Sequence, residues 1–452
     1  MMRARTPTAV VLVVAVIALS GAPDADVTLP DPQTLARTWA REHLPLPLPP
    51  LIRHEDVGRE IARLEAGAGA LVSVERIGES VEDRAIHHLT IGRGPLRVLL
   101  WSQMHGDEPT ATVALFDVIE YLRRRPDDPV VGRLLDRLTL HIVPMLNPDG
   151  AERFQRRNAQ GIDINRDALA LQTPEGRALK ALRDRLEPAI GFNLHNQNWR
   201  TSVGSPGRPA AMSLLAVAYD EAGSDNEGRI LARKVCSVIR QAVEPLAPGM
   251  MGRYDDDFEV RAFGDNLTKW GTSVVLIETG PHPGPEPDAA LLAINYVAIL
   301  TALDALASGR AHDADPALYG SLPLNGSRLF HTLVRNATIV TGTGAPPFTG
   351  DLGFTGTRVV RRNGGRAAAR FEGRLEDLGD LRVYGALESI DASGLTAAPL
   401  WRDDLEVGQV VTLPRRRAKG PHLLPGQPAA AVLLKPTPSP RRYVVERIVR
   451  VE

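Results

Sequence analysis

The chain has 452 residues, and 53 lysines and arginines against 54 aspartates and glutamates leave a net charge of −1. A hydrophobic fraction of 43% and a charged fraction of 24% exclude a largely disordered, collagen-like or multi-pass membrane chain. The near-zero charge argues against a nucleic-acid-binding protein, and the length predicts two or three domains. The single cysteine, Cys236, excludes an intrachain disulfide and cysteine-rich metal sites, so a metal site would need histidine and carboxylate ligands.

The first residues have the three parts of a secretory signal peptide. Arg3 and Arg5 precede an apolar run from Ala9 to Leu19, and small residues follow it. The run is short for a membrane-spanning helix, so we predict a signal peptide over residues 1–22 and no membrane span after its cleavage. The alternative is an uncleaved N-terminal anchor. Cleavage predicts an exported protein, either periplasmic or extracellular.

Strand-like and helix-like segments alternate through the first two thirds of the chain. Two alternating runs within residues 70–91 predict a β-hairpin. The apolar runs typical of buried strands are Leu96–Trp101, Leu138–Leu146, Ala189–Leu194 and Thr272–Ile277, and helical spacing occurs over residues 54–64, 110–124, 175–186 and 227–243. This alternation predicts an α/β fold with a mixed, largely parallel sheet flanked by helices.

The last third of the chain has a different pattern. Gly, Pro, Ser and Asp dominate around residues 309–325, which predicts a linker. Short strand-like runs with Gly and Pro turns follow: Leu333–Val340, Thr357–Arg362, Val410–Leu413, Ala430–Leu434 and Tyr443–Val451. We therefore predict an α/β domain over residues 23–310, a linker over 311–325 and a small all-β, sandwich-like accessory domain over 326–452.

Polar residues suited to catalysis stand where the predicted strands end. His105 and Glu108 follow the first apolar run, His195 ends the third, and Glu278 ends the fourth. The carboxyl ends of parallel strands meet at one crevice, so we expect these four side chains to converge. Two histidines and one carboxylate suit zinc with a fourth position open for water, and the remaining glutamate suits a general base. A lone His-x-x-Glu is a weak signal, and the two later residues strengthen it.

A second polar loop adds two further patterns. Asn147-Pro-Asp-Gly150 is a strong turn signal, and by itself it predicts only a turn. Asn165 and Arg166 place an amide beside a planar guanidinium, a pair that suits a carboxylate.

Together these elements resemble the carboxypeptidase A-like zinc peptidases. The His-x-x-Glu loop, the Asn-Pro-Asp-Gly turn, residues 156–166, the later histidine and the final glutamate stand in that family's order, over roughly residues 72–303. The resemblance implies one zinc ion held by His105, Glu108 and His195. It also implies that Glu278 is the general base that acts on zinc-activated water and later protonates the leaving nitrogen.

The resemblance also assigns residues around the ion. Arg156 matches the arginine that stabilises the tetrahedral oxyanion, and Arg157 is an adjacent competitor for that role. Asn165 and Arg166 match the pair that binds the C-terminal carboxylate of the substrate. Asp163 matches a carboxylate that orients the first zinc histidine.

A mobile tyrosine also precedes the final glutamate in that family. Tyr254, which precedes Glu278 by 24 residues, stands in the corresponding region, and the alternative is an ordinary loop aromatic. The acidic triplet from Asp255 to Asp257 contacts a basic substrate group or is simply solvated. Asp256 and Asp265 are two candidates for selecting a basic side chain, and the sequence leaves the side-chain preference open.

The C-terminal region resembles a different family. Residues 333–348, 390–394 and 426–434 look like segments of the β-sandwich portion of amidohydrolases. No His-x-His follows Pro399, Ala430 replaces a usual acidic residue, and no room for a barrel remains between Leu400 and Pro425. This predicts a sandwich without a metal site, in a packing or binding role.

The leading functional hypothesis is an exported zinc metallocarboxypeptidase. Its partner would be a peptide or peptide-like substrate with a free C-terminal carboxylate. The alternative is a zinc-dependent deacylase of N-acyl amino acids, like the aspartoacylase and succinylglutamate desuccinylase relatives. A third hypothesis is a binding module that has lost catalysis.

Overall fold

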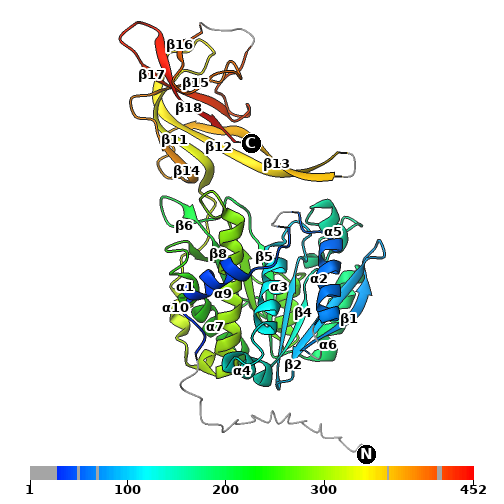
Figure 1. Ribbon diagram of the computed structural model, residues 1–452. Helices are drawn as coiled ribbons and strands as arrows, with labels where there is room; N and C mark the ends of the chain where they lie inside the picture. The colour runs from blue at the N-terminus through cyan, green and yellow to red at the C-terminus, as the bar shows by residue number, and fades with distance from the viewer. Residues whose placement is uncertain (1–27, 48–50, 68–70, 364–365, 415–419, 452) are drawn as a thin grey trace, which may run out of the picture.

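The computed structural model describes residues 28–47, 51–67, 71–363, 366–414 and 420–451. The predicted signal peptide, residues 1–22, lies outside the described residues. Figure 1 shows an α/β domain below and a β-rich region above it.

An eight-stranded mixed sheet forms the centre of the α/β domain. Its order is β1-β2-β4-β3-β5-β10-β8-β9. The strands are β1 Val72–Glu79, β2 Ala85–Gly92, β3 Leu96–Ser102, β4 Leu138–Val143, β5 Ile190–Asn196, β8 Met212–Ala216, β9 Met251–Arg253 and β10 Ser273–Thr279. The neighbours β4, β3, β5 and β10 run parallel, while β2 and β8 flank them antiparallel. The predicted fold class and the hairpin of β1 and β2 are therefore confirmed.

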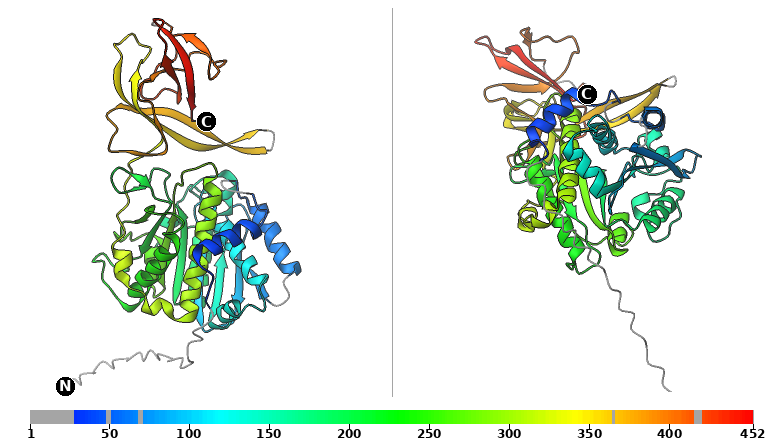
Figure 2. Two further views of the ribbon diagram at one scale, coloured as in Figure 1. Left: turned by 60° about the vertical axis from the view of Figure 1, so that its left-hand side comes forward. Right: turned by 60° about the horizontal axis from the view of Figure 1, so that its bottom comes forward.

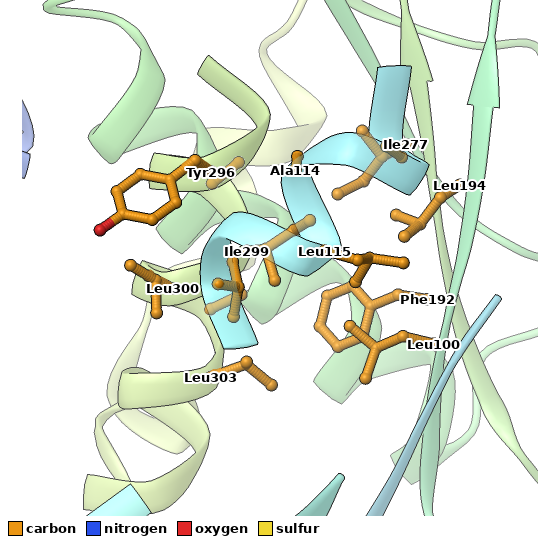
Figure 3. Packing of buried hydrophobic residues seen from close by; sticks show 14 of the residues in the cluster. Leu100, Ala114, Leu115, Phe192, Leu194, Ile277, Tyr296, Ile299, Leu300 and Leu303 are labelled. Carbon is orange, nitrogen blue, oxygen red and sulfur yellow. The ribbon is translucent and has the colours of Figure 1, made fainter. Parts of the chain in front are cut away.

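Helices cover both faces of this sheet. They are α1 Pro32–Glu42, α2 His54–Gly67, α3 Thr110–Arg123, α4 Pro129–Arg137, α5 Pro148–Arg153, α6 Pro174–Leu186, α7 Glu227–Val243, α8 Phe263–Lys269 and α9 Pro287–Ser308. The larger apolar core joins one face of the sheet to α3, α7 and α9, and a smaller core joins the other face to α6 and α8. Figure 3 shows side chains from β3, β5 and β10 on one side of α3 and side chains from α9 on its other side.

Helix α9 is buried inside the larger core. It is the one helix in the described part of the chain that is long and apolar enough to cross a membrane. However, 78% of its apolar 18-residue stretch is buried inside the domain. It packs against α3 and α7. Burial on all sides explains why its sequence is apolar all round rather than amphipathic.

The Asn-Pro-Asp-Gly turn is the beginning of helix α5. Asn147 caps the helix by accepting a hydrogen bond of 2.9 Å from the backbone N–H of Gly150, and Pro148 occupies the first helical position. A β-carbon at Gly106 would lie 1.9 Å from the carbonyl carbon of Gly150. The close approach of the two backbones therefore needs glycine at position 106.

The predicted linker packs against the α/β domain. It contains a 3-10 turn, η3 Arg310–Asp313, and the short helix α10 Pro316–Gly320. Helix α10 lies on α7, and the buried Tyr319 accepts a hydrogen bond of 3.2 Å from the N–H of Ala216 through its hydroxyl. This hydrogen bond holds the segment that leads to the C-terminal region against the α/β domain.

The C-terminal region is a second sheet of eight strands. They are β11 Leu329–Ile339, β12 Phe348–Asn363, β13 Arg366–Gly379, β14 Gly385–Asp391, β15 Thr396–Pro399, β16 Val410–Thr412, β17 Ala430–Pro436 and β18 Arg442–Arg450. Strands β12 and β13 form a long hairpin, of which the sequence predicted only residues 357–362. The rest of the hairpin lacks clear apolar alternation in its sequence, so the pattern on which strand prediction depends is missing. The resemblance to an amidohydrolase sandwich stays a prediction.

A buried aspartate holds helix α1 against α3. Asp117 accepts hydrogen bonds from the indole Nε1 of Trp39 at 2.7 Å and from the N–H of Leu44 at 2.8 Å. Burial raises the pKa of Asp117 to about 6. Because this value lies above the ordinary 3.8, the contribution of the carboxyl to the free energy of unfolding is fully present below pH 3.8 and is lost as pH rises through about 6.

We predict that Trp39→Phe destabilises the protein more at high pH than at low pH. The variant leaves one oxygen of Asp117 without its donor, at a cost of about 1–3 kcal/mol when the carboxylate is ionised. Urea unfolding at pH 5 and pH 8 measures the difference. The control is Trp39→Phe combined with Asp117→Asn, whose penalty should not change with pH, and an equal penalty for the single variant at both pH values contradicts the prediction.

Candidate metal centre

Three buried side chains place their ligand atoms around one point. The Nδ1 atoms of His105 and His195 and the carboxylate of Glu108 all lie within 4.8 Å of one another, the one such group found in the described part of the chain. Nδ1 of His105 lies 2.8 Å from one Glu108 oxygen, and Nδ1 of His195 lies 2.7 Å from the other. Two imidazole nitrogens and one carboxylate are a donor set that suits zinc.

Strand register places Glu278 beside this group. Strands β5 and β10 run parallel with His195 directly opposite Glu278, so both side chains point to the same face of the sheet. The Oε2 atom of Glu278 is buried and has no hydrogen-bond partner within the described residues. Such an atom is suited to act on a substrate or a water molecule.

The loop after β3 carries the other two ligands. Gln103 has a left-handed backbone with φ of 49°, and the loop turns back so that the N–H of Glu108 bonds the carbonyl of His105. Helix α3 begins two residues after Glu108. The tight loop therefore lets residues three apart in sequence face one point.

Asp163 supports the first histidine from behind. Its Oδ1 lies 3.1 Å from Nε2 of His105, on the opposite side of the ring from Glu108. This bond favours the tautomer that leaves the Nδ1 lone pair facing Glu108. The other oxygen of Asp163 accepts a bond of 2.9 Å from Nε of Arg156.

Burial and charge oppose each other in the cluster. Burial lowers the pKa of His105, but the charge of Glu108 and the hydrogen bond with Asp163 outweigh it and raise the pKa to about 9. Burial, with smaller effects from the charges of His105 and Arg156, outweighs Glu108 and lowers the pKa of His195. Burial would raise the pKa of Glu108, but the two histidines hold it well below its usual range. A cation that binds here displaces the proton of His105, so its affinity falls at low pH.

Glu278 responds in the opposite direction. Burial first, and the charge of Glu108 second, raise the pKa of Glu278 to about 8. The surroundings of this carboxyl therefore bring its pKa close to neutral pH, a property common at catalytic positions.

Arg156 lies against the ligand group, whereas Arg157 does not. The Nη1 atom of Arg156 is 3.1 Å from Nδ1 of His105 and 3.4 Å from Glu108, and its side chain is 43% exposed. Arg157 donates to the carbonyl of Gly161 at 3.1 Å. Of the two arginines weighed for oxyanion stabilisation, the structure brings Arg156 to the site.

Asn165 and Arg166 lie on the 3-10 turn η2 Ile164–Arg166, and protein groups already engage both. The amide oxygen of Asn165 accepts a bond of 2.9 Å from the N–H of Phe263. Nε of Arg166 lies 3.1 Å from a carboxylate oxygen of Glu259, which also pairs with Arg261. Sequence reasoning missed Glu259 because no motif or spacing marks it.

Tyr254 lies within the electrostatic reach of the site. Burial, followed by the charges of Glu278 and Glu108, raises its pKa. It follows β9, and its N–H bonds the carbonyl of Leu214 at 3.0 Å. The side chain is 37% exposed.

Both aspartates considered for specificity have protein partners. Asp256 pairs with Arg229 at 2.9 Å, and Arg229 is itself buried. Asp265 accepts a bond of 3.0 Å from the N–H of Glu259, and burial raises its pKa to about 6. The contact with Arg229 gives Asp256 a structural partner that sequence reasoning did not identify.

A comparison of the sequence with known protein families identifies one family. Residues 59–214 match the zinc carboxypeptidase family model. The chain contains a zinc carboxypeptidase domain. The matched range includes His105, Glu108, His195 and the segment from Arg156 to Arg166, and it ends before Tyr254 and Glu278.

Individual relatives align over part of this zinc carboxypeptidase domain. Carboxypeptidase D of Rattus norvegicus is 30% identical over 144 residues, which cover 28% of this chain and 10% of that protein. Probable carboxypeptidase 2 of Trichophyton verrucosum is 32% identical over 100 residues, 22% of this chain and 19% of that protein. The chain thus spans a fifth or less of the length of these two relatives. A metallo-carboxypeptidase from Pseudomonas aeruginosa in complex with (2-guanidinoethylmercapto)succinic acid aligns with a TM-score of 0.45 and 22% identity, over 56% of this chain and 68% of that chain.

We predict that Asp163→Ala weakens zinc binding by roughly 10–100-fold, because His105 loses the bond that fixes its tautomer and ring orientation. Competition with a chromogenic chelator measures the affinity. Asp163→Asn keeps an acceptor for the ring N–H and should lose less. Equal affinities of Asp163→Ala and the wild type would show that Asp163 does not orient the ligand.

Proposed function

We propose that the protein is an exported zinc metallocarboxypeptidase that hydrolyses C-terminal peptide bonds. The carrying observation is the position of Glu278 directly beside His195, at the edge of the His105–Glu108–His195 group. A donor set for zinc and a carboxyl with an unpartnered oxygen are the two parts that metal-assisted hydrolysis needs. Export is a prediction from residues 1–22, outside the described part.

The residues present fit a single zinc ion. His105, Glu108 and His195 would hold it through two nitrogens and one carboxylate, and Asp163 would support the first histidine. Zinc, when bound, supplies a Lewis acid that polarises the carbonyl to be cleaved.

Glu278 moves the proton. With its free oxygen at the site, the carboxylate accepts a proton from the attacking water and then transfers it to the nitrogen of the leaving residue. The surroundings that raise its pKa help it hold that proton between the two steps.

Three further side chains orient the substrate. The guanidinium of Arg156 lies at His105 and Glu108, where it donates to the oxygen that gains negative charge during attack. Asn165 and Arg166 bind the terminal carboxylate, which replaces Glu259 on Arg166. This exchange of one carboxylate for another keeps the arginine paired throughout.

We predict that the zinc-loaded protein cleaves blocked dipeptides with a free carboxylate and cleaves their amidated counterparts roughly 10–100-fold more slowly. A lost charged hydrogen bond at Arg166 costs about 1.5–3 kcal/mol. The assay measures the released C-terminal residue, with peptidoglycan-like peptides and N-acyl amino acids in the same panel and a chelator-treated sample as control. Faster cleavage of N-acyl amino acids than of any peptide favours the deacylase alternative.

We predict that Glu278→Gln lowers kcat by roughly 10²–10⁴-fold while zinc content stays unchanged, because the amide cannot accept the proton of water. Steady-state kinetics and metal analysis measure both quantities. Glu221→Gln, at an exposed position, is the matched control and should behave as the wild type. Full activity of Glu278→Gln would rule out this mechanism.

A further inference from the structure

The β12–β13 hairpin lies across the face of the α/β domain from which the loops of the site leave. Figure 1 shows it extending above β5 and towards α5, and the left view in Figure 2 shows it again lying over the top of the α/β domain. The carboxyl ends of β3, β5 and β10, which carry the proposed ligands and the base, lie on this side of the sheet.

The loop that follows His195 contacts the second sheet. Arg200, five residues after His195, forms an ion pair with Glu376 of β13. The ring of Trp199 lies 6.3 Å from that of His331 on β11, which in turn lies 4.8 Å from the ring of Phe371 on β13. The base of the hairpin is therefore attached to the segment that leaves the metal centre.

A second attachment lies on the segment that follows Glu278. Arg358 of β12 pairs with Asp288 in the first turn of α9, at 3.1 and 3.3 Å. The backbone of the second sheet also approaches the α/β domain closely at Gly385 of β14. A β-carbon at that position would lie 1.5 Å from the carbonyl oxygen of Gly207. These contacts hold the second sheet against the α/β domain.

The outer part of the hairpin is basic, whereas the hairpin as a whole, residues 348–379, has six arginines against four acidic residues and a net charge of +2. Residues 357–374 contain six arginines and one glutamate, a net charge of +5 in a chain whose total is −1. Arg370 and Arg374 on β13 are exposed. In the α/β domain, just after α5, the exposed Arg157 donates to a backbone carbonyl, a bond that does not neutralise its charge.

We propose that the β12–β13 hairpin selects peptides that are acidic upstream of the bond to be cleaved. This proposal rests on the proposed function. A substrate whose last residue occupies the site extends upstream by about 3.3–3.6 Å per residue, so a few residues carry it past the hairpin. Positive charge along that path attracts acidic residues and repels basic ones over about 10 Å at moderate ionic strength.

The test compares peptides that share one C-terminal pair of residues. Six upstream residues are all Glu, all Gln or all Lys, and a blocked dipeptide serves as the short substrate. We expect kcat/KM to be about tenfold higher for the acidic peptide than for the neutral one at low salt, with the difference shrinking as salt is added. In the Arg370→Ala/Arg374→Ala variant, we expect the ratio of kcat/KM between the acidic and the neutral peptide to fall from about tenfold to about threefold or less.

Controls separate the hairpin from the site. The double variant should cleave the blocked dipeptide as the wild type does, because a dipeptide does not extend to the hairpin. Arg402→Ala/Arg442→Ala removes two exposed arginines elsewhere in the C-terminal region and should keep the preference. Equal rates for the acidic, neutral and basic peptides, or an unchanged preference in the Arg370→Ala/Arg374→Ala variant, would overturn the proposal.

Binding provides a readout that needs no turnover. Fluorescence anisotropy of the labelled acidic peptide measures affinity for the wild type and for Arg370→Ala/Arg374→Ala. If the wild type cleaves no peptide yet binds the acidic one through these arginines, the proposed function fails and the hairpin proposal stands. Tighter binding of a single-stranded oligonucleotide of equal charge would overturn the hairpin proposal in favour of a nucleic acid ligand.

Discussion

The parallel pairing of β5 with β10 is the constraint on which the site depends. Because both strands run in the same direction in register, His195 and Glu278 stand side by side although 83 positions separate them in the chain. The pairing of β3 with β5 then brings the loop of His105 and Glu108 to the same edge. Cores on both faces keep these strands in place, so the ligand geometry follows from packing far from the site.

The site concentrates groups that are costly to bury apart. Each charge in it has an opposite partner: Glu108 faces two histidines, and Asp163 joins His105 to Arg156. Such networks tolerate burial because every member is paired, and removing one leaves its partner exposed to the full desolvation cost. Glu278 is the exception, because one of its oxygens has no hydrogen-bond partner among the described residues.

The second sheet is attached to the segments that lead away from the metal centre. Its contacts fall on the segments that follow His195 and Glu278, so the same strand ends that hold the reactive groups also hold the hairpin. His105, Glu108, His195 and Glu278 could be predicted as site residues because each stands at or just after the end of an apolar run. Glu259 on Arg166, Arg229 on Asp256 and the full hairpin could not, because each depends on contacts between segments whose separation carries no periodic signal.

The sequence by itself determined the α/β alternation, the two histidines and two glutamates at strand ends, and the basic composition of residues 357–374. These are local properties, set by hydrophobic periodicity and by the chemistry of single side chains. Only the tertiary structure decided that Asp163 also binds Arg156, that Arg156 rather than Arg157 meets the ligands, and that the hairpin lies over the face of the α/β domain where β5 ends. Those outcomes depend on strand register and on the contacts between the two sheets, and the chain acquires both only when distant segments pack together.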